Sequence, residues 1–107
     1  MEIAIATLDI DTQLIKKSSF VIRAINHPLR QSILQLIHSK SRIIVTEIYQ
    51  TSGIEQSVAS QHLAIMRRQG FVNTERDGKC IYYSVNYGRL QQVEELCREL
   101  IRHKSLE

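Results

Sequence analysis

Residues 56–68 combine short polar side chains with an apolar repeat at helical spacing. If this segment is a helix, Ala59, Leu63 and Met66 fall on one face at i, i+4 and i+7, which is the spacing of core residues. The opposite face then presents short side chains without negative charge, namely Ser57, Val58, Ser60, Gln61 and Ala64. Amide, hydroxyl and small apolar groups of this kind fit against the edges of nucleic-acid bases.

The polar face of this predicted helix could make specific contacts with the bases of duplex DNA. The Gln61 amide suits the two hydrogen-bonding groups of adenine, the Val58 methyls suit a thymine methyl, and serine hydroxyls reach bases or phosphates. The two arginines that follow suit backbone phosphates. An ordinary surface helix with small polar residues is the alternative. The predicted DNA-binding residues of this segment are Gln56, Ser57, Val58, Ser60, Gln61, Arg67 and Arg68.

A β-hairpin is predicted immediately after this segment. Residues 71–76 and 79–85 are strand-like runs separated by Asp77-Gly78. Asp-Gly between two such runs is a strong hairpin signal, because the turn requires positive φ. Arg76 and Lys79 flank the predicted tip, where they would meet phosphates or enter a groove. Cations at a hairpin edge also prevent edge-to-edge aggregation, and the two roles are compatible.

Positive charge is concentrated in this part of the chain. The whole chain has 14 Lys and Arg against 11 Asp and Glu, for a net charge of +3. Five of the basic residues but only Glu75 and Asp77 among the acidic ones lie within residues 56–89. Such a distribution favours a surface that meets a polyanion, although a solvated basic face is the alternative.

The elements that position these residues are mostly helical. Helices are predicted over residues 11–26, 28–39, 46–52, 56–69 and 87–103, and the hairpin over 71–85. Pro28 suits the first turn of the second helix, Thr46 is expected to cap the third helix and Asn86 the last. Gly53 separates two short helices, as in a helix-turn-helix. We therefore expect a single domain over residues 1–107 of the α+β class, mainly α with a small hairpin: a winged helix-turn-helix.

The first and last predicted helices carry more apolar surface than one small core needs. Polar side chains form only a narrow stripe on helix 11–26, so this helix must be buried on more than one side. In a chain of 107 residues, a partner subunit explains the second side better than additional core. The predicted dimer-interface residues are Leu14, Val21, Ile25, Leu90, Val93, Cys97, Leu100 and Ile101.

Composition excludes several other classes of protein. No apolar run approaches the roughly 20 residues that span a bilayer. We also find no signal-peptide pattern at the N-terminus, so we expect a cytoplasmic protein with no membrane partner. Cys80 and Cys97 are the only two cysteines, which favours a reducing compartment. No nucleophile-base set, paired carboxylates or phosphate-binding glycine loop is visible, so we do not expect an enzyme.

Three motifs occur in a characteristic order: NHPLRQSIL at residues 26–34, SQHL at 60–63 with GFV at 70–72, and DGK at 77–79 with YYSV at 82–85. In these motifs the chain resembles the ArsR/SmtB family of bacterial repressors, over nearly its whole length. The resemblance implies a homodimer built on the first and last helices. It also implies binding to operator DNA with helix 56–69 in the major groove, and release by an inducer. Glu55 departs from the family pattern, which often has a serine that caps the recognition helix. A shorter helix capped by Ser57 is the alternative.

The resemblance also points to two family metal sites, and this sequence matches neither. One site uses a Cys-x-Cys pair in the helix before the recognition helix, where residues 45–50 contain no cysteine. The ligand positions of the other site fall on Tyr87, Arg89, Leu100 and His103. Of these only His103 has a side chain that could ligate a metal, and one ligand does not make a site. We therefore expect no metal site and no cofactor.

The sequence thus predicts a homodimeric regulator that binds double-stranded DNA at a palindromic operator, with an unknown inducer. Two alternatives stay open. One is a winged-helix module that binds another protein. The other is a thiol-based sensor of oxidants or reactive sulfur that uses Cys80 or Cys97. Nothing in the sequence brings the two thiols within disulfide range, and Cys97 fits a small core or interface position.

Overall fold

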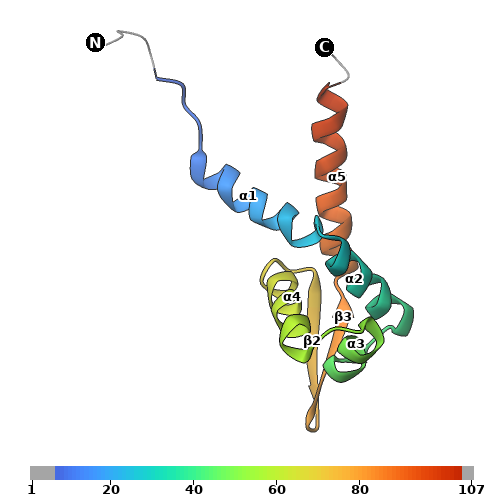
Figure 1. Ribbon diagram of the computed structural model, residues 1–107. Coiled ribbons are helices and arrows are strands. Elements are labelled where there is room, and N and C mark those ends of the chain that lie inside the picture. Colours follow the sequence, from blue (N-terminus) through green and yellow to red (C-terminus); the bar gives the residue numbers. More distant parts are fainter. Residues whose placement is uncertain (1–6, 105–107) are drawn as a thin grey trace.

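The computed structural model describes residues 7–104, except for the side chains of residues 103 and 104. It confirms the predicted fold class: helices surround a small antiparallel sheet with the strand order β1-β3-β2 (Figure 1). The elements in chain order are α1 (Thr12–Ile25), α2 (Pro28–Lys40), β1 (Ile43–Ile44), α3 (Val45–Ser52), α4 (Gln56–Arg68), β2 (Val72–Asp77), β3 (Cys80–Val85) and α5 (Tyr87–Lys104).

Side chains cap three of the helices at their N-terminal ends. The Asp11 carboxylate accepts a hydrogen bond from the backbone N–H of Leu14 at 3.0 Å at the start of α1. His27 Nδ1 accepts from the N–H of Leu29 at 3.2 Å, just before α2 begins at Pro28. Asn86 accepts from the N–H of Arg89 at 3.1 Å at the start of α5. Each cap satisfies a backbone donor that the helix itself leaves unpaired.

The predicted cap at Thr46 is wrong. Helix α3 begins one residue earlier, at Val45, and its N-cap residue is Ile44, with no side-chain hydrogen bond. Ile44 is still paired with Tyr82 of β3 and has the extended φ and ψ of a strand. The helix therefore starts directly from the end of β1, which places Thr46 inside its first turn.

The hairpin turn lies one residue further along the chain than predicted. Asp77 is paired with Cys80, so Gly78 and Lys79 form the two-residue turn and Asp77 belongs to β2. Of these two turn residues only Gly78 has a positive φ, +64°. One family of tight hairpin turns requires glycine at the first central position alone, which explains why Lys79 is accommodated at the second.

The core lies between α2, α3, α4 and one face of the sheet. Its largest fully buried side chains are Phe71, Ile33, Ile37, Ile43, Ile48, Leu63 and Met66. The predicted inward face of α4 is confirmed, because Ala59, Leu63 and Met66 are all at most 1% exposed. The same core also includes residues of α1, α2, α3, α5 and all three strands, so the inner face of α4 is held against the body of the molecule.

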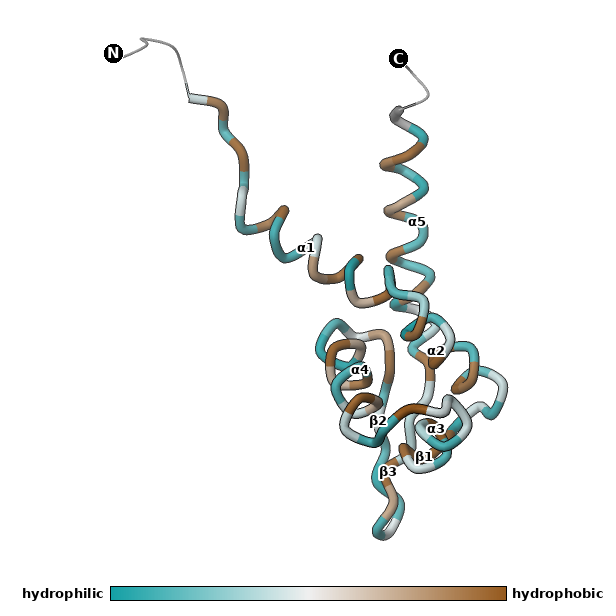
Figure 2. The backbone as a smooth tube through the Cα atoms, in the orientation of Figure 1, coloured by the Kyte–Doolittle hydropathy of each residue, from teal (hydrophilic) through white to brown (hydrophobic). Residues whose placement is uncertain are grey.

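Helices α1 and α5 extend away from this body as two diverging arms (Figure 1). Ala24, close to the end of α1, is that helix's one buried residue. Apolar positions continue along both arms (Figure 2). The radius of gyration is 18.4 Å, compared with about 13 Å for a compact domain of about 100 residues. A single protomer thus leaves the apolar surfaces of both arms uncovered.

Candidate nucleic-acid interface

The outer face of α4 is exposed and free of acidic side chains. Gly53 ends α3 in the left-handed conformation, with φ 68° and ψ 33°, so the chain turns sharply before α4 begins. Because the inner face of α4 is buried in the core, its outer face points away from the body. Ser57, Ser60 and Gln61 are exposed there, and Val58 is half-buried. The structure thus presents the predicted base-contacting side chains together on one surface.

The N-terminal end of α4 has no side-chain cap. Its N-cap residue is Glu55, in an extended conformation, and the Glu55 carboxylate makes no capping hydrogen bond. Helix α4 begins at Gln56, which places Ser57 within the first turn. The alternative of a shorter helix capped by Ser57 is therefore wrong.

A hydrogen-bonded cluster holds the middle of α4 against the junction of α1 and α2. Arg30 Nε donates to His62 Nδ1 at 3.1 Å, and Arg30 Nη1 donates to the carbonyl oxygen of Arg23 at 2.9 Å. The His27 ring lies 4.9 Å from the His62 ring, centroid to centroid. Burial, the Arg30 charge and His27 together lower the pKa of His62 below 6.5. Since His62 Nδ1 accepts a hydrogen bond, the ring is neutral and carries its proton on Nε2.

The C-terminal end of α4 turns directly into the sheet. The N–H groups of Gly70 and Phe71 donate to the carbonyl oxygens of Arg67 and Met66, at 3.0 and 2.9 Å. Gly70 has a φ of +86°, which suits glycine and reverses the chain. The side chains of Arg67 and Arg68 are exposed at this end of the helix.

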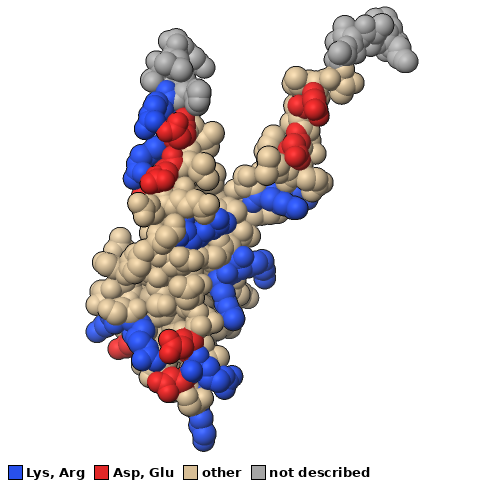
Figure 3. Space-filling model, turned by 180° about the vertical axis from the view of Figure 1, so that it is seen from behind, with Lys and Arg blue, Asp and Glu red and all other residues tan. Residues whose placement is uncertain are grey.

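Arg42 adds a fourth arginine to the basic surface formed by Arg67, Arg68, Arg76 and Lys79, and the sequence alone did not indicate it. Arg42 Nη2 lies 3.5 Å from Asp77 Oδ2, and the Arg42 guanidinium lies 3.7 Å from the centroid of the Tyr82 ring. Arg42 precedes β1, and the pairing of β1 with β3 places it against the hairpin. It offsets the charge of Asp77, next to Arg76 and Lys79. Figure 3 shows basic and acidic side chains gathered together at this end of the molecule.

The predicted dimer-interface residues divide into two groups. Val21, Ile25, Leu90, Val93 and Cys97 pack against the protomer's own core, and Val93 is only 4% exposed. Leu14, Leu100 and Ile101 are 60%, 64% and 69% exposed. The structure adds exposed apolar residues of the same two arms that the predicted set omitted, namely Ile15, Phe20, Ile22 and Leu96.

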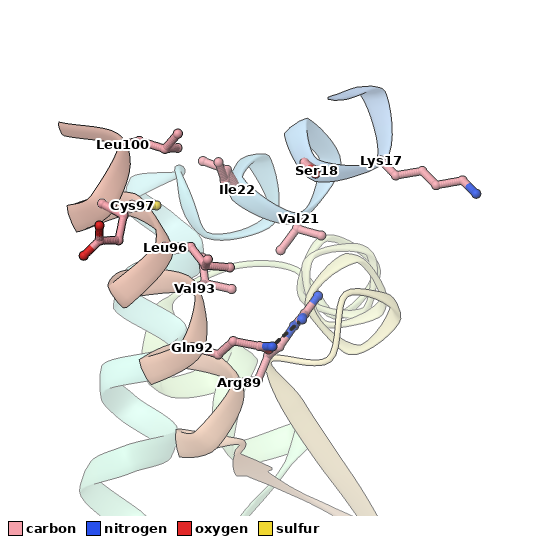
Figure 4. A pocket seen from close by; sticks show the side chains of 11 residues that line it. Lys17, Ser18, Val21, Ile22, Arg89, Gln92, Val93, Leu96, Cys97 and Leu100 are labelled. Atoms are coloured by element: carbon pink, nitrogen blue, oxygen red, sulfur yellow. Dashed lines mark hydrogen bonds between the residues drawn. The ribbon is translucent and has the colours of Figure 1, made fainter. Parts of the chain in front are cut away.

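The two arms enclose an apolar groove of about 560 Å³ (Figure 4). Val21 and Ile22 of α1 face Leu96 and Leu100 of α5 across it. Arg89 and Gln92 lie at its base. A second hollow, of about 540 Å³, lies on another side of α5 and includes Ile101. Helix α5 thus offers apolar surface on more than one side, which is the pattern of a helix that packs against another chain.

Known proteins share both the motifs and the fold of this chain. The profile described as "Bacterial regulatory protein, arsR family" matches residues 27–74, from the cap of α2 into β2. The transcriptional repressor PagR of Bacillus anthracis is 32% identical over 76 residues, which cover 71% of this chain and 76% of PagR. The chain belongs to the ArsR family.

Solved ArsR-like structures have the same architecture as this chain. NolR from Sinorhizobium fredii aligns with a TM-score of 0.68 and 28% identity, over 90% of this chain and 96% of NolR. The homodimeric winged helix-turn-helix DNA-binding domain of Mb0332 from Mycobacterium bovis aligns with a TM-score of 0.67 over 96% of this chain and 94% of that domain. At 20% identity, the second likeness concerns the fold alone. The structural likeness therefore extends over at least 90% of the chain in both cases.

Other features of this ArsR-family chain concern ligands and thiols. Within residues 7–102, no three His, Cys, Asp or Glu side chains are grouped to hold a metal ion. The side chain of His103, the one candidate ligand noted in the sequence, lies outside the described residues. Cys80 is exposed on β3 and Cys97 is half-buried on α5, and both are free thiols. In the part of the chain that the structure covers, no helix is both long and apolar enough to traverse a bilayer.

Proposed function

We propose that the chain is a homodimeric transcriptional repressor that reads a palindromic operator with α4. The observation that carries the proposal is the outer face of α4, where Ser57, Ser60 and Gln61 are exposed without any acidic neighbour on that helix. The major groove of DNA admits a helix with such a face, and short amide and hydroxyl side chains reach base edges there. The chain's membership of the ArsR family supports this proposal, as does its similarity to PagR, which is a transcriptional repressor.

The uncovered apolar arms support the dimer. Leu14, Leu100 and Ile101 are each at least 60% exposed in the single protomer, which is unfavourable for large apolar side chains in water. A second copy that packs its own arms against α1 and α5 buries them. The two copies of α4 then lie about 34 Å apart, one turn of the duplex, on the same face of the DNA.

The hairpin is proposed to contact the phosphates beside each half-site. Lys79 occupies the turn itself, Arg76 lies on β2, and both are exposed. Arg67 and Arg68 extend the basic surface at the end of α4. Contacts of this kind hold the protein in register on the duplex and make binding salt-dependent, but they carry no sequence information of their own.

Selection from a randomised duplex library tests the proposal directly. The purified chain is expected to enrich a symmetric consensus whose half-sites lie about 10 base pairs apart, centre to centre. Binding that is equal for all duplexes, or absent, would contradict the proposal and favour a winged-helix module that binds another protein. Release by an inducer is part of the same proposal, and it is measured by adding metal ions or thiol oxidants to the operator complex.

A further inference from the structure

Arg89 connects the base of the groove between the arms to the end of α4. It lies in the first turn of α5, and Arg89 Nε donates a hydrogen bond to the carbonyl oxygen of Gln69 at 2.9 Å. Gln69 is the C-cap residue of α4, where helix carbonyls have no partner within the helix. A cation at this end is also favoured by the helix dipole. Arg89 thus supplies a partner that α4 itself lacks.

The chain around this contact is closely packed. Asn86 Nδ2 donates to the carbonyl oxygen of Gly70 at 2.9 Å, and the N–H of Asn86 donates to the carbonyl oxygen of Phe71 at 2.9 Å. A Cβ added at Gly70 would lie 3.5 Å from Arg89 Nε, which shows how near the Arg89 side chain comes to the backbone of Gly70. The Arg89 guanidinium lies 5.8 Å from the centroid of the Phe71 ring. Three hydrogen bonds from Asn86 and Arg89 therefore tie the start of α5 to the residues that directly follow α4.

The same side chain forms part of the groove. Arg89 Nη1 donates to Gln92 Oε1 at 3.0 Å, and both residues lie at the base of the groove beneath Val93 and Leu96 (Figure 4). None of the ion pairs found among the described residues involves Arg89. Its guanidinium instead contacts the Gln69 carbonyl oxygen. The Arg89 side chain therefore both lines the groove and contacts the end of α4.

We propose that Arg89 is a positioning residue for DNA binding: it transmits the orientation of α5, set by dimerisation, to α4. This inference rests on the proposed function. A palindromic operator fixes the separation of the two recognition helices, so a rigid joint between each α4 and its α5 is needed to match that spacing. Without the Arg89 contact, each α4 still fits a half-site, but the two helices are no longer held at one separation.

The test compares Arg89→Met with Arg89→Lys and the matched control Arg98→Met. Methionine keeps most of the aliphatic stem of Arg89 but has no hydrogen-bond donor. Arg98 is an exposed arginine of α5 that pairs with Glu94. For each protein we measure the dimer dissociation constant, then the affinity for three duplexes: the selected operator, an operator one base pair longer between half-sites, and a single half-site.

The expected result is a loss of about tenfold in affinity of Arg89→Met for the selected operator, the size associated with one charge-assisted hydrogen bond. In Arg89→Met the dimer dissociation constant and the affinity for the single half-site stay at wild-type values. Its preference for the selected operator over the operator with one extra base pair between half-sites becomes smaller. Arg89→Lys, which keeps a donor, restores part of the preference, and Arg98→Met behaves as wild type.

Three results would overturn the proposal. Equal losses on the half-site and the full operator would show that Arg89 only maintains the structure of α4. If Arg89→Met matches Arg98→Met on all three duplexes, Arg89 has no positioning role, although the proposed function stands. If the wild-type chain selects no operator, the proposed function fails first, and the role of Arg89 in DNA binding fails with it.

Discussion

Gln61 is the side chain on α4 best suited to identify a base, since its exposed amide matches adenine with both a donor and an acceptor. We expect Gln61→Ala to weaken operator binding by about 1–3 kcal/mol and to relax the base preference at one position in each half-site. Affinities for the consensus and for its single-base variants, measured at one salt concentration, check this. Gln91→Ala, at an exposed position of α5, is the control and should bind as wild type. Unchanged discrimination by Gln61→Ala would mean that another surface reads the DNA.

Glu55 leaves the start of α4 without a side-chain cap. Serine at an N-cap position accepts a hydrogen bond from a first-turn N–H group, so we expect Glu55→Ser to raise the free energy of unfolding by about 1 kcal/mol. Urea denaturation followed by circular dichroism measures the change. Glu47→Ser, within the first turn of α3 rather than at its cap, should bring no such gain. A lower stability of Glu55→Ser would show that Glu55 stabilises this end in another way.

His62 makes the stability of the protein depend on pH. Its pKa is lowered in the folded state by burial, Arg30 and His27, so the unfolded chain binds more protons in mildly acidic solution. This contribution to stability is therefore complete above the unfolded pKa of 6.5 and is lost as the pH falls through the lower folded value. We expect His62→Asn to lose less stability than wild type between about pH 7.5 and about pH 5.5. Urea titrations at both pH values test this, with His38→Asn as the control. An equal loss in wild type and His62→Asn would contradict it.

The hairpin turn carries a lysine that can contact a DNA phosphate without contributing to the recognition of bases. Lys79 lies at the tip and is exposed, with nothing in the protein's core depending on it. We expect Lys79→Ala to weaken binding to all duplexes alike and to reduce the slope of log affinity against log salt concentration by about 1. Lys16→Ala removes an exposed lysine of α1 that does not line the groove; it is the control and should leave the slope unchanged. A sequence-dependent effect of Lys79→Ala would assign base contacts to the hairpin.

The spacing of residues in the sequence predicted features that depend only on neighbouring residues, such as the buried face of α4. The i, i+4, i+7 repeat of Ala59, Leu63 and Met66 indicated which face of α4 is buried, because a helix repeats every 3.6 residues. The hairpin was predicted correctly, but its turn was placed one residue early, since the sequence does not show which pair of residues closes the ladder. Likewise, Thr46 has the chemistry of a cap, but the extension of β1 to Ile44 decided where α3 begins.

Contacts between distant segments were beyond prediction. Arg42 reaches Asp77 and Tyr82 only because β1 pairs with β3, and the length of β1, two residues, gave almost no signal. Val93 and Leu100 share the same apolar stripe in the sequence, although one is 4% and the other 64% exposed. The body of the protomer ends between them, and only the packing of the whole fold shows where it ends.

For the whole molecule, the divergence of α1 and α5 makes the proposed dimerisation separable from folding. Leu100 is largely exposed in the protomer and lines the groove between the arms, so a charge there leaves the protomer's core intact. We expect Leu100→Glu to give a folded monomer with at least about tenfold weaker self-association, because burying an unpaired carboxylate is costly. Sedimentation equilibrium and circular dichroism measure the two properties.

Gln91→Glu is the matched control for Leu100→Glu, since it adds the same charge at an exposed position of the same helix. It should dimerise as wild type. Operator affinity should fall together with dimerisation in Leu100→Glu and remain unchanged in Gln91→Glu. A Leu100→Glu chain that dimerises normally would show that the partner packs elsewhere.

The outer turns of α5 stand clear of the protomer's body (Figure 1), and isolated helical turns fray in water. A chain without its partner therefore presents unprotected backbone to proteases, whereas the proposed dimer would conceal it. We therefore expect monomers to be degraded before dimers in the cell. The amount of undegraded protein would then follow the amount of dimer that can bind a two-fold symmetric DNA site.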